Sequence, residues 1–318
     1  MAELSEFELI ERYFSPLGLS QNNHVAQSIG DDCGVIQTPP GMSLCFSIDT
    51  MVEGVHFPKG APPFKLGYRA LAAALSDLAA MGAQPFFFTL ALTMPSADPD
   101  WLAEFSAGMK VLVGKHHFPL LGGDTTRGPL SISIQVHGLL SEPALLRSGA
   151  KPGDVIAVSG SLGDAGAALD FLCNDEGTLD DAKRYLLSRY YSPTPRIELG
   201  QALIGKATAC IDISDGLMAE LQHISRASKV KLELDVDSLP LSESLVTYKG
   251  LQAAKEGALT AGDDYELLFT MPEHECLELV SQFPEEGITI IGKVSSGSGV
   301  HLMGFHKDLA NMGYQHFD

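Results

Sequence analysis

The chain has 318 residues, of which 45% are hydrophobic and 19% are charged. This composition is typical of a folded globular protein, and the length favours two domains over a single core. With 21 Lys and Arg against 40 Asp and Glu, the formal net charge is −19, which argues against binding to a nucleic-acid backbone. An acidic protein can still bind a small phosphate ligand when divalent cations lie between the like charges.

Cysteine usage and the N-terminus indicate the compartment. Five cysteines occur, an odd number at wide spacings and without a C-x-x-C pair: Cys33, Cys45, Cys173, Cys210 and Cys276. This usage argues against a disulfide framework or a zinc site and fits a reducing compartment. The first 14 residues lack the basic and apolar regions of a signal peptide, and no apolar run approaches the ~20 residues of a membrane span. We therefore expect a soluble cytoplasmic protein.

The first half of the chain alternates between helix and strand patterns. Ser5, with Glu8 three residues later, predicts a capping box that opens a short helix to Phe14. Apolar runs and polar alternation then predict a strand over 44–48, a helix over 64–81, a buried strand over 86–93, a helix over 98–116 and a strand over 132–136. The helix over 64–81 is almost entirely apolar, so we expect it to be buried.

The second half begins after turn chemistry at residues 151–154 (K-P-G-D). We place the domain boundary nearby, which gives domains 1–148 and 149–318. The later segments predict a strand over 154–158, a helix after the loop 159–166, a helix starting within 192–195, a strand ending over 211–214, a helix over 217–227 and a strand over 288–294. Helices and strands alternate throughout, so the fold class is α/β or α+β.

The usual nucleotide-binding motifs are absent. No G-x-x-x-x-G-K-[ST] loop occurs, and the kinase glycine-rich loop and H-R-D set are missing as well. Gly160, Gly163 and Gly166 form a G-x-x-G-x-x-G pattern between a strand and a helix. This pattern fits either a phosphate cradle or a tight turn.

A recurring feature is an aspartate beside Gly, Ser or Thr at the end of an apolar segment. These aspartates are Asp31 and Asp32, Asp49, Asp77, Asp124, Asp212, Asp215, Asp263 and Asp264. Each one alone is more typical of a turn or a cap than of a ligand. Several converging carboxylates would repel one another unless a hard cation such as Mg²⁺ lay between them.

Asp77 is the strongest single candidate. It lies inside the apolar helix over 64–81, where an unpaired carboxylate would cost several kcal/mol. Arg69 is two turns away on the same helix and is too far for a local ion pair. The position therefore fits either a metal ligand or a carboxylate with another partner.

Two basic residues each have two possible roles. Arg147 fits a phosphate contact or a surface salt bridge, and His56 fits a ligand contact or a structural histidine.

Taken together, the motifs resemble the thiamine-monophosphate kinase family over nearly the whole chain. The segments that carry the resemblance are 49–57 (D-T-M-V-E-G-V-H-F), 76–83 (S-D-L-A-A-M-G-A), 122–126 (G-G-D-T-T) and 212–217 (D-I-S-D-G-L). The first of these is the most discriminating, because short pieces of the others recur in related ATP-using synthetases.

The resemblance implies the two-domain fold of the aminoimidazole ribonucleotide synthetase superfamily. In that fold the N-terminal domain binds ATP and Mg²⁺ and pairs in a homodimer, and a C-terminal α/β domain completes the active site. The implied reaction is direct in-line transfer of the γ-phosphoryl group of ATP to thiamine monophosphate, assisted by several Mg²⁺ ions. The product is thiamine diphosphate, and the partners are the two substrates and a second copy of the chain, without nucleic acid or membrane.

The resemblance also implies roles for individual residues. The implied Mg²⁺ ligands are Asp31, Ser47, the carbonyl of Ile48, Asp49, Asp77, Asp124, Asp212 and Asp215. The implied ATP contacts are Gly123, Asp124, Arg147 and Ser214, and the implied contacts to thiamine monophosphate are His56, Asp263 and Tyr314. Asp49, Asp124 and Arg147 are the implied catalytic residues. Asp263 stands where the family has Glu, so the carboxylate is kept on a side chain one methylene shorter.

Other functions leave different marks. A selenophosphate synthetase would need a reactive Cys near the N-terminus, and residues 1–30 contain none; a hydrogenase-maturation dehydratase would need a C-terminal Cys, and the chain ends in residues 313–318 (G-Y-Q-H-F-D). A nucleotide or thiamine-phosphate sensor is expected to lose aspartates from the metal set, and none is lost here. A two-metal phosphatase would share the aspartates but not the dependence on ATP.

Overall fold

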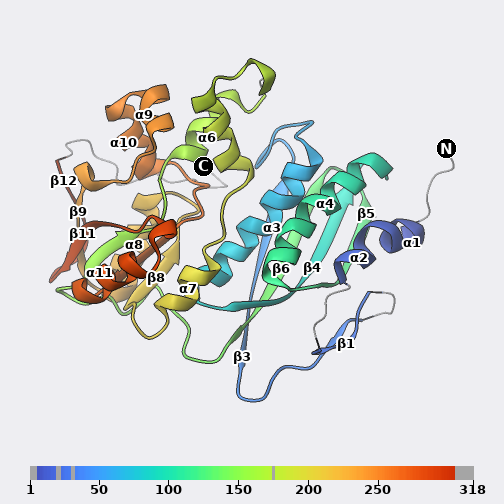
Figure 1. Ribbon diagram of the computed structural model, residues 1–318, viewed down its shortest axis with the longest axis horizontal. Coiled ribbons are helices and arrows are strands. Elements are labelled where there is room, and N and C mark those ends of the chain that lie inside the picture. Colours follow the sequence, from blue (N-terminus) through green and yellow to red (C-terminus); the bar gives the residue numbers. More distant parts are fainter. Residues whose placement is uncertain (1–5, 19–22, 30–32, 174–175, 305–318) are drawn as a thin grey trace. The chain divides into compact units, whose positions relative to one another are not determined.

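The computed structural model describes residues 6–18, 23–29, 33–173 and 176–304 (Figure 1). The chain divides into two compact units, one made of residues 1–78 and 83–141 and the other of residues 79–82 and 142–318. The domain boundary expected between residues 148 and 149 stays a prediction. Within the described ranges, no helix is both long and apolar enough to cross a membrane.

The first unit combines short N-terminal helical turns, a small hairpin, two long helices and a four-stranded sheet. Its elements are α1 (Glu6–Leu9), a π-helical turn (Ile10–Phe14), α2 (Ser15–Gly18), β1 (Val25–Gln27), β2 (Val35–Ile36), β3 (Ser43–Val52), α3 (Pro63–Ala80), β4 (Gln84–Met94), α4 (Pro99–His116), β5 (Leu120–Arg127) and β6 (Ser131–Leu140). The helix α3 extends into residues assigned to the second unit.

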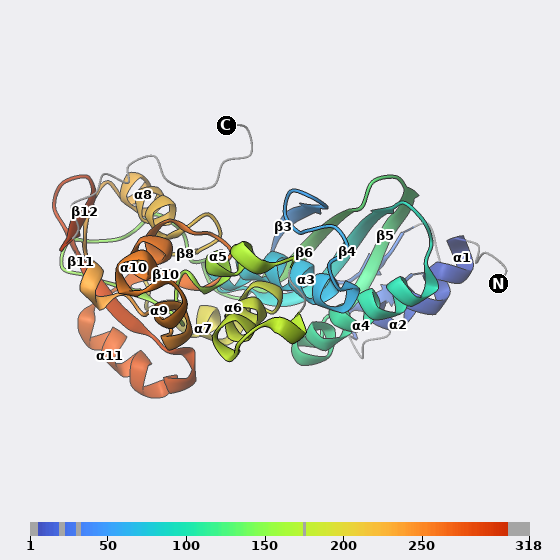
Figure 2. The same cartoon turned by 90° about the horizontal axis from the view of Figure 1, so that it is seen from above.

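The main sheet of this unit has the strand order β3-β6-β4-β5. The strand β6 pairs antiparallel with β3 and β4, whereas β5 pairs parallel with β4. Figure 2 shows α3 and α4 on one face of this sheet. The strands β3 and β5 form its two edges.

The second unit is built on a six-stranded mixed sheet. Its elements are β7 (Val155–Val158), α5 (Asp164–Ala168), η2 (Leu169–Phe171), η3 (Glu176–Thr178), α6 (Asp181–Tyr191), α7 (Ile197–Leu203), β8 (Ala209–Asp212), α8 (Leu217–Ser228), β9 (Lys231–Asp235), η4 (Val236–Ser238), α9 (Glu243–Lys249), α10 (Leu251–Thr260), β10 (Leu267–Met271), α11 (Glu273–Gln282), η5 (Pro284–Glu286), β11 (Thr289–Ser295) and β12 (Gly299–Met303).

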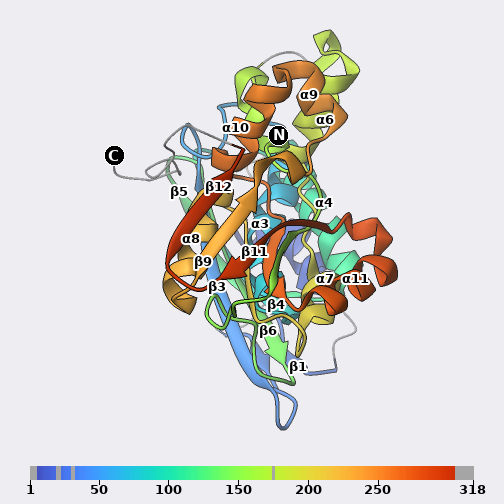
Figure 3. The same cartoon turned by 90° about the vertical axis from the view of Figure 1, so that its left-hand side faces the viewer.

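The six strands follow the order β12-β9-β11-β7-β10-β8. All neighbours are antiparallel except β12 and β9. Figure 3 shows α8 and α11 on opposite sides of this sheet. The apolar face of α8, with Leu217, Leu221 and Ile224, packs in the core with Ile156 of β7 and Leu232 of β9.

Several predicted elements are confirmed. The helix over 98–116 is α4, and Asp98 caps it by accepting from the backbone N–H groups of Asp100 at 3.0 Å and Trp101 at 3.3 Å. The buried apolar helix is α3, in which Leu71, Ala74 and Leu75 are fully buried. The capping box expected at Ser5 lies outside the described residues.

Two predictions about local structure are wrong. The helix expected to begin within 192–195 begins at Ile197, and Arg196 precedes it with its side chain paired to Glu266 and Glu286. The G-G-D-T-T motif over 122–126 is not a turn at the end of a segment but part of the strand β5. Pairing with β4 decides this, and a propensity for turns cannot foresee such a pairing.

Candidate active site

Consecutive residues of β3 point to opposite faces of the first unit's sheet, because side chains alternate along a strand. Ser47 and Asp49 are half-buried on the face that carries α3, whereas Ile48 between them is 63% exposed on the other face. The family resemblance implies that Ser47, Ile48 and Asp49 all bind Mg²⁺. The side chain of Ile48 points away from the other two, so Ile48 can contribute only its backbone carbonyl.

The helix α3 brings Asp77 to this face of β3. The hydroxyl of Ser47 donates to Oδ2 of Asp77 at 2.5 Å. Burial, followed by repulsion from the Asp77 carboxylate, raises the pKa of Asp49 to about 7. The structure thus brings Ser47, Asp49 and Asp77 together, as the resemblance implies. Two carboxylates beside a hydroxyl form an oxygen donor set of the kind that Mg²⁺ prefers.

His56 is fixed in the turn that follows β3. Its Nδ1 accepts from the backbone N–H of Val52 at 3.0 Å, and Gly54 N–H donates to the Phe57 carbonyl at 2.8 Å. The neutral imidazole therefore carries its proton on Nε2. This leaves Nε2–H as the group with which the ring would donate to an anionic ligand.

Asp124 lies on the face of the sheet opposite to Asp49. In the strand register Asp124 is level with Ala91, and two residues further on the hydroxyls of Thr126 and Thr93 are 2.8 Å apart, which fixes the face to which these side chains belong. Gly123, which precedes Asp124, allows β5 to approach β4 closely, because a Cβ on this residue would lie 2.0 Å from the carbonyl oxygen of Leu90.

The second unit presents another set of predicted residues where β8 gives way to α8. Asp212 ends β8 and is 5% exposed, while Ser214 and Asp215 in the connecting turn are half-buried. The turn then requires Gly216, whose φ of 108° is in a region that other residues avoid and whose Cβ would lie 2.8 Å from the Thr260 carbonyl oxygen. Asp212, Ser214 and Asp215 therefore lie together at the start of α8.

Glu220 is a further carboxylate at this location and is not among the residues predicted from the sequence. It is 3% exposed in the first turn of α8, and its Oε1 accepts from the N–H of Asp215 at 3.4 Å. Burial, and after it the charge of Asp212, raise the pKa of Glu220 to about 8. The sequence does contain a pattern that indicates this burial, because Glu220 lies at helical spacing between Leu217, Leu221 and Ile224, on the apolar face of an amphipathic helix.

Arg147 is exposed in the segment that precedes β7. Its backbone carbonyl accepts from the Ser228 hydroxyl at 3.2 Å. Its guanidinium lies close enough to α8 to limit the rise in the pKa of Glu220, and after burial it is the next cause of the lowered pKa of His223. Arg147 thus supplies positive charge beside an otherwise acidic set of side chains.

Asp263 lies beside the same turn. Its backbone N–H donates to the Ser214 carbonyl at 2.8 Å, and its carboxylate accepts from the Tyr265 hydroxyl at 3.2 Å.

The backbone N–H groups of the loop with Gly160 and Gly163 bind other parts of the protein and are not free for a phosphate. Gly160 N–H donates to the Glu286 carbonyl at 2.9 Å, and Gly163 N–H donates to Asp264 Oδ2 at 2.8 Å. This loop is therefore a tight turn.

The candidate residues divide into a set in each unit, and within the first unit Asp124 lies on the opposite face of the sheet from Asp49. The first unit holds Ser47, Ile48, Asp49, His56, Asp77, Gly123 and Asp124, and the second holds Arg147, Asp212, Ser214, Asp215 and Asp263. Asp31 and Tyr314 lie outside the described residues. Across the described part of the chain, no group of three or more His, Cys, Asp or Glu side chains forms a ready metal site. The paired oxygen donors nonetheless fit a cation that completes its shell with phosphate oxygens and water.

The fold and these two sets define the class of protein. The family model "AIR synthase related protein, N-terminal domain" matches residues 30–140, and the model "AIR synthase related protein, C-terminal domain" matches residues 151–304. Together they cover most of the chain, so it is a two-domain AIR synthase related protein.

Comparison with individual proteins narrows the class. The chain is 43% identical to thiamine-monophosphate kinase of Salmonella typhimurium over 98% of both chains. It resembles the crystal structure of thiamine-monophosphate kinase from Stenotrophomonas maltophilia with a TM-score of 0.87 and 41% identity, covering 95% of this chain and 97% of that one. It resembles AaThiL complexed with AMPPCP and TMP with a TM-score of 0.80 and 31% identity, covering 100% and 99%. The chain belongs to the thiamine-monophosphate kinase family.

Proposed function

We propose that this protein is a kinase that uses ATP to phosphorylate thiamine monophosphate, giving thiamine diphosphate and ADP. The observation that carries the proposal is the full-length likeness to thiamine-monophosphate kinases together with the grouping of Ser47, Asp49 and Asp77. A related protein of the same fold is complexed with AMPPCP and TMP, which supports a site for a nucleotide and a second ligand.

The residue inventory suits this chemistry. The acceptor is a phosphate oxygen that is already ionised at neutral pH, so the enzyme needs no general base to activate it. Catalysis then depends on positioning and on neutralising charge, because two unit charges 4 Å apart repel by about 4 kcal/mol at an effective dielectric of 20. Bound Mg²⁺ would supply that neutralisation, and we expect direct in-line transfer.

We assign the metal-binding role to the two acidic sets. In the first unit Asp49 and Asp77 would hold Mg²⁺ with Ser47 and the Ile48 carbonyl, and Asp124 would bind Mg²⁺ from the other face of the sheet. In the second unit Asp212 and Asp215 would do so. Asp31 completes the proposed set. The raised pKa of Asp49 supports this role, because a carboxylate that is costly to ionise alone gains most from a cation.

The remaining residues are assigned to the two substrates. Gly123, Asp124, Arg147 and Ser214 would contact ATP, with Arg147 offering a planar guanidinium to the phosphates. His56, Asp263 and Tyr314 would contact thiamine monophosphate, and His56 would donate from Nε2. Asp49, Asp124 and Arg147 are the residues to which we assign catalysis.

We propose a homodimer formed through the open face of the first unit's sheet. On β3 the side chains of Leu44, Phe46 and Ile48 are 43%, 68% and 63% exposed, which is unusual for three large apolar residues in a row on one strand face. A second copy would cover them. We further place the protein in the cytoplasm, since all five cysteines are free thiols.

The proposed reaction is tested by chromatography of the products. Purified protein is incubated with ATP, Mg²⁺ and thiamine monophosphate, with unphosphorylated thiamine as the parallel acceptor. We expect thiamine diphosphate only when ATP, Mg²⁺ and the monophosphate are all present. Absence of product, with ATP binding still seen by calorimetry, would contradict the kinase assignment and favour a sensor. Release of phosphate from thiamine monophosphate without ATP would favour a phosphatase.

A further inference from the structure

The segment over 262–266 is joined by backbone hydrogen bonds to the turn that follows β8. Asp263 N–H donates to the Ser214 carbonyl, Tyr265 N–H to the Ile213 carbonyl and Ile213 N–H to the Glu266 carbonyl, each at 2.8 Å. The segment assigned to thiamine monophosphate and the turn assigned to ATP and Mg²⁺ therefore form one backbone ladder within the second unit.

The conformation of this segment needs support from its surroundings. Asp263 and Tyr265 have φ values of 70° and 51°, in the left-handed region that costs energy for any residue other than Gly. Both are half-buried, whereas Asp264 and Glu266, which alternate with them, are 2% and 0% exposed. The two buried side chains are thus placed to anchor a strained backbone.

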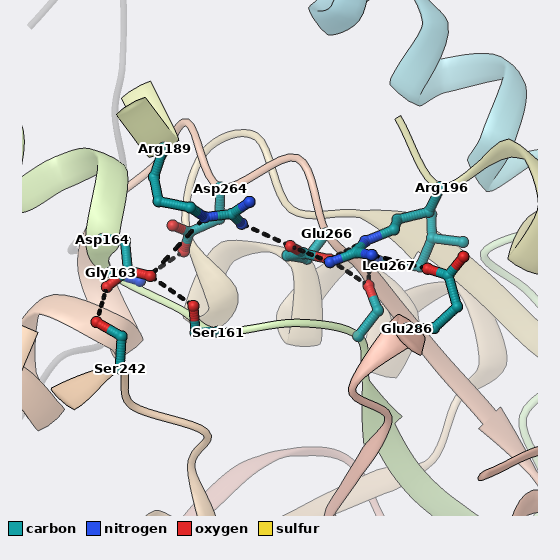
Figure 4. Close-up of polar contacts among 11 residues, drawn as sticks. Ser161, Gly163, Asp164, Arg189, Arg196, Ser242, Asp264, Glu266, Leu267 and Glu286 are labelled. Atoms are coloured by element: carbon teal, nitrogen blue, oxygen red, sulfur yellow. Dashed lines mark hydrogen bonds and ion pairs between the residues drawn. The ribbon is translucent and has the colours of Figure 1, made fainter. Parts of the chain in front are cut away.

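Glu266 has a dense set of donors. Its carboxylate accepts from Arg189 Nη2 at 2.6 Å, from Arg196 Nε at 2.6 Å and Nη2 at 2.8 Å, and from the Ser159 hydroxyl at 2.5 Å (Figure 4). Buried carboxylates with several charged donors are held in one geometry, because losing a partner leaves a buried charge unpaired. Asp264 adds a second anchor through the Gly163 N–H.

We propose that Glu266, held by Arg189 and Arg196, is a positioning residue that keeps Asp263 in register with Ser214 and Asp215. The inference rests on the function proposed above, which gives these three residues their roles. Glu266 touches neither substrate in this scheme. It acts through the backbone ladder, so its loss should affect the handling of both substrates by folded enzyme.

The test compares Glu266→Gln with Glu286→Gln. Glu286 provides a matched control, because it binds Nη1 of the same Arg196 at 2.8 Å but lies outside the 262–266 segment. Assayed well below its own melting temperature, Glu266→Gln should lower kcat at least tenfold and raise KM for thiamine monophosphate several-fold. Glu286→Gln should stay within threefold of the wild type in both constants.

Hydrogen exchange gives a readout that needs no substrate. Peptides that cover 209–217 and 261–267 should exchange at least tenfold faster in Glu266→Gln than in the wild type, and at the wild-type rate in Glu286→Gln. Unchanged kcat and KM in Glu266→Gln, with only a lower melting temperature, would overturn the proposal.

Two further outcomes remain decisive. If Glu266→Gln does not fold, hydrogen exchange is measured on the wild type alone. Exchange of the Ile213, Asp263 and Tyr265 amides as fast as that of exposed loops would overturn the proposal. Strong protection of these amides would support it. If the wild type forms no thiamine diphosphate, the proposed function fails, while the exchange comparison still tests whether Glu266 holds the ladder.

Discussion

Asp49 shows how neighbours decide what a single residue does. In water its carboxyl would be ionised at neutral pH, but burial and the nearby Asp77 raise its pKa to about 7. A carboxylate in such a place is costly to the protein unless a cation offsets its charge. The position of Asp49 is therefore better explained by cation binding than by a contribution to the stability of the fold.

Replacing Asp49 by Asn should separate these two roles. We expect Asp49→Asn to lower kcat at least 100-fold, because a neutral amide is a poor Mg²⁺ ligand, and to leave the melting temperature of the metal-free protein unchanged or higher. The measurements are steady-state kinetics and thermal unfolding, with Glu104→Gln on the exposed side of α4 as a control that keeps full activity. Wild-type kcat in Asp49→Asn would remove this residue from the proposed metal site.

At the scale of elements, β5 shows how pairing can override local pattern. The sequence G-G-D-T-T favours a turn, yet residues 122–126 pair with β4 in register. Gly123 permits this pairing because its missing Cβ leaves room for the Leu90 carbonyl, whereas a Cβ on Gly122 would meet nothing within 4 Å. The two glycines of one motif therefore differ in their structural roles: only Gly123 is required by the close approach of β4.

This difference predicts unequal effects of two alanine substitutions. Gly123→Ala should destabilise the protein by about 3 kcal/mol, because backbone atoms of β4 would have to move. Gly122→Ala should change stability by less than about 1 kcal/mol. Urea unfolding of both variants measures the difference. Equal stability would mean that β5 lies further from β4 than the structure has it.

The buried segment over 262–266 gives a prediction about pH. Burial raises the pKa of Asp264 well above its ordinary value, despite the hydrogen bond from Gly163 N–H. The folded state therefore binds this proton more tightly than the unfolded state does, and stability is lost as pH rises from about 4 through the folded-state pKa. Asn at this position cannot titrate and would not show that loss.

We accordingly expect Asp264→Asn to flatten the dependence of stability on pH. The variant should gain stability relative to the wild type as pH rises from 5 to 8, measured by thermal unfolding in matched buffers without metal. Asp164 and Glu286 titrate in both proteins, so the difference between the two curves reports the titration of Asp264 together with its coupling to the Asp164 charge. Parallel curves would show that Asp264 is ionised in the folded protein over this range.

At the scale of the whole molecule, Asp49 and Asp124 cannot bind one ion within a single chain. They lie on opposite faces of the sheet and on its two edge strands, three strand spacings or about 14 Å apart. Mg²⁺ holds its ligands at about 2.1 Å. If both residues serve one site, a second copy must supply one of them.

Mixed dimers test this arrangement. Asp49→Asn and Asp124→Asn should each be nearly inactive alone, but the mixed dimer should have about half of the wild-type activity, since one of its two shared sites is intact. The mixed species is purified with two different tags and assayed for thiamine diphosphate. An inactive mixed dimer would show that each chain builds its own site, and a monomer in sedimentation would contradict the proposed dimer.

The sequence by itself determined the alternation of helices and strands, the buried helix α3 and the acidic motifs that single out the family. Local patterns suffice for these, because periodicity and residue type are properties of neighbouring residues. Only the tertiary structure decided that 122–126 is a strand, that Asp49 and Asp124 face apart, and that Glu220 and Glu266 are buried among charges. Those facts depend on strand pairing, register and packing between segments far apart in the chain, which no local pattern records.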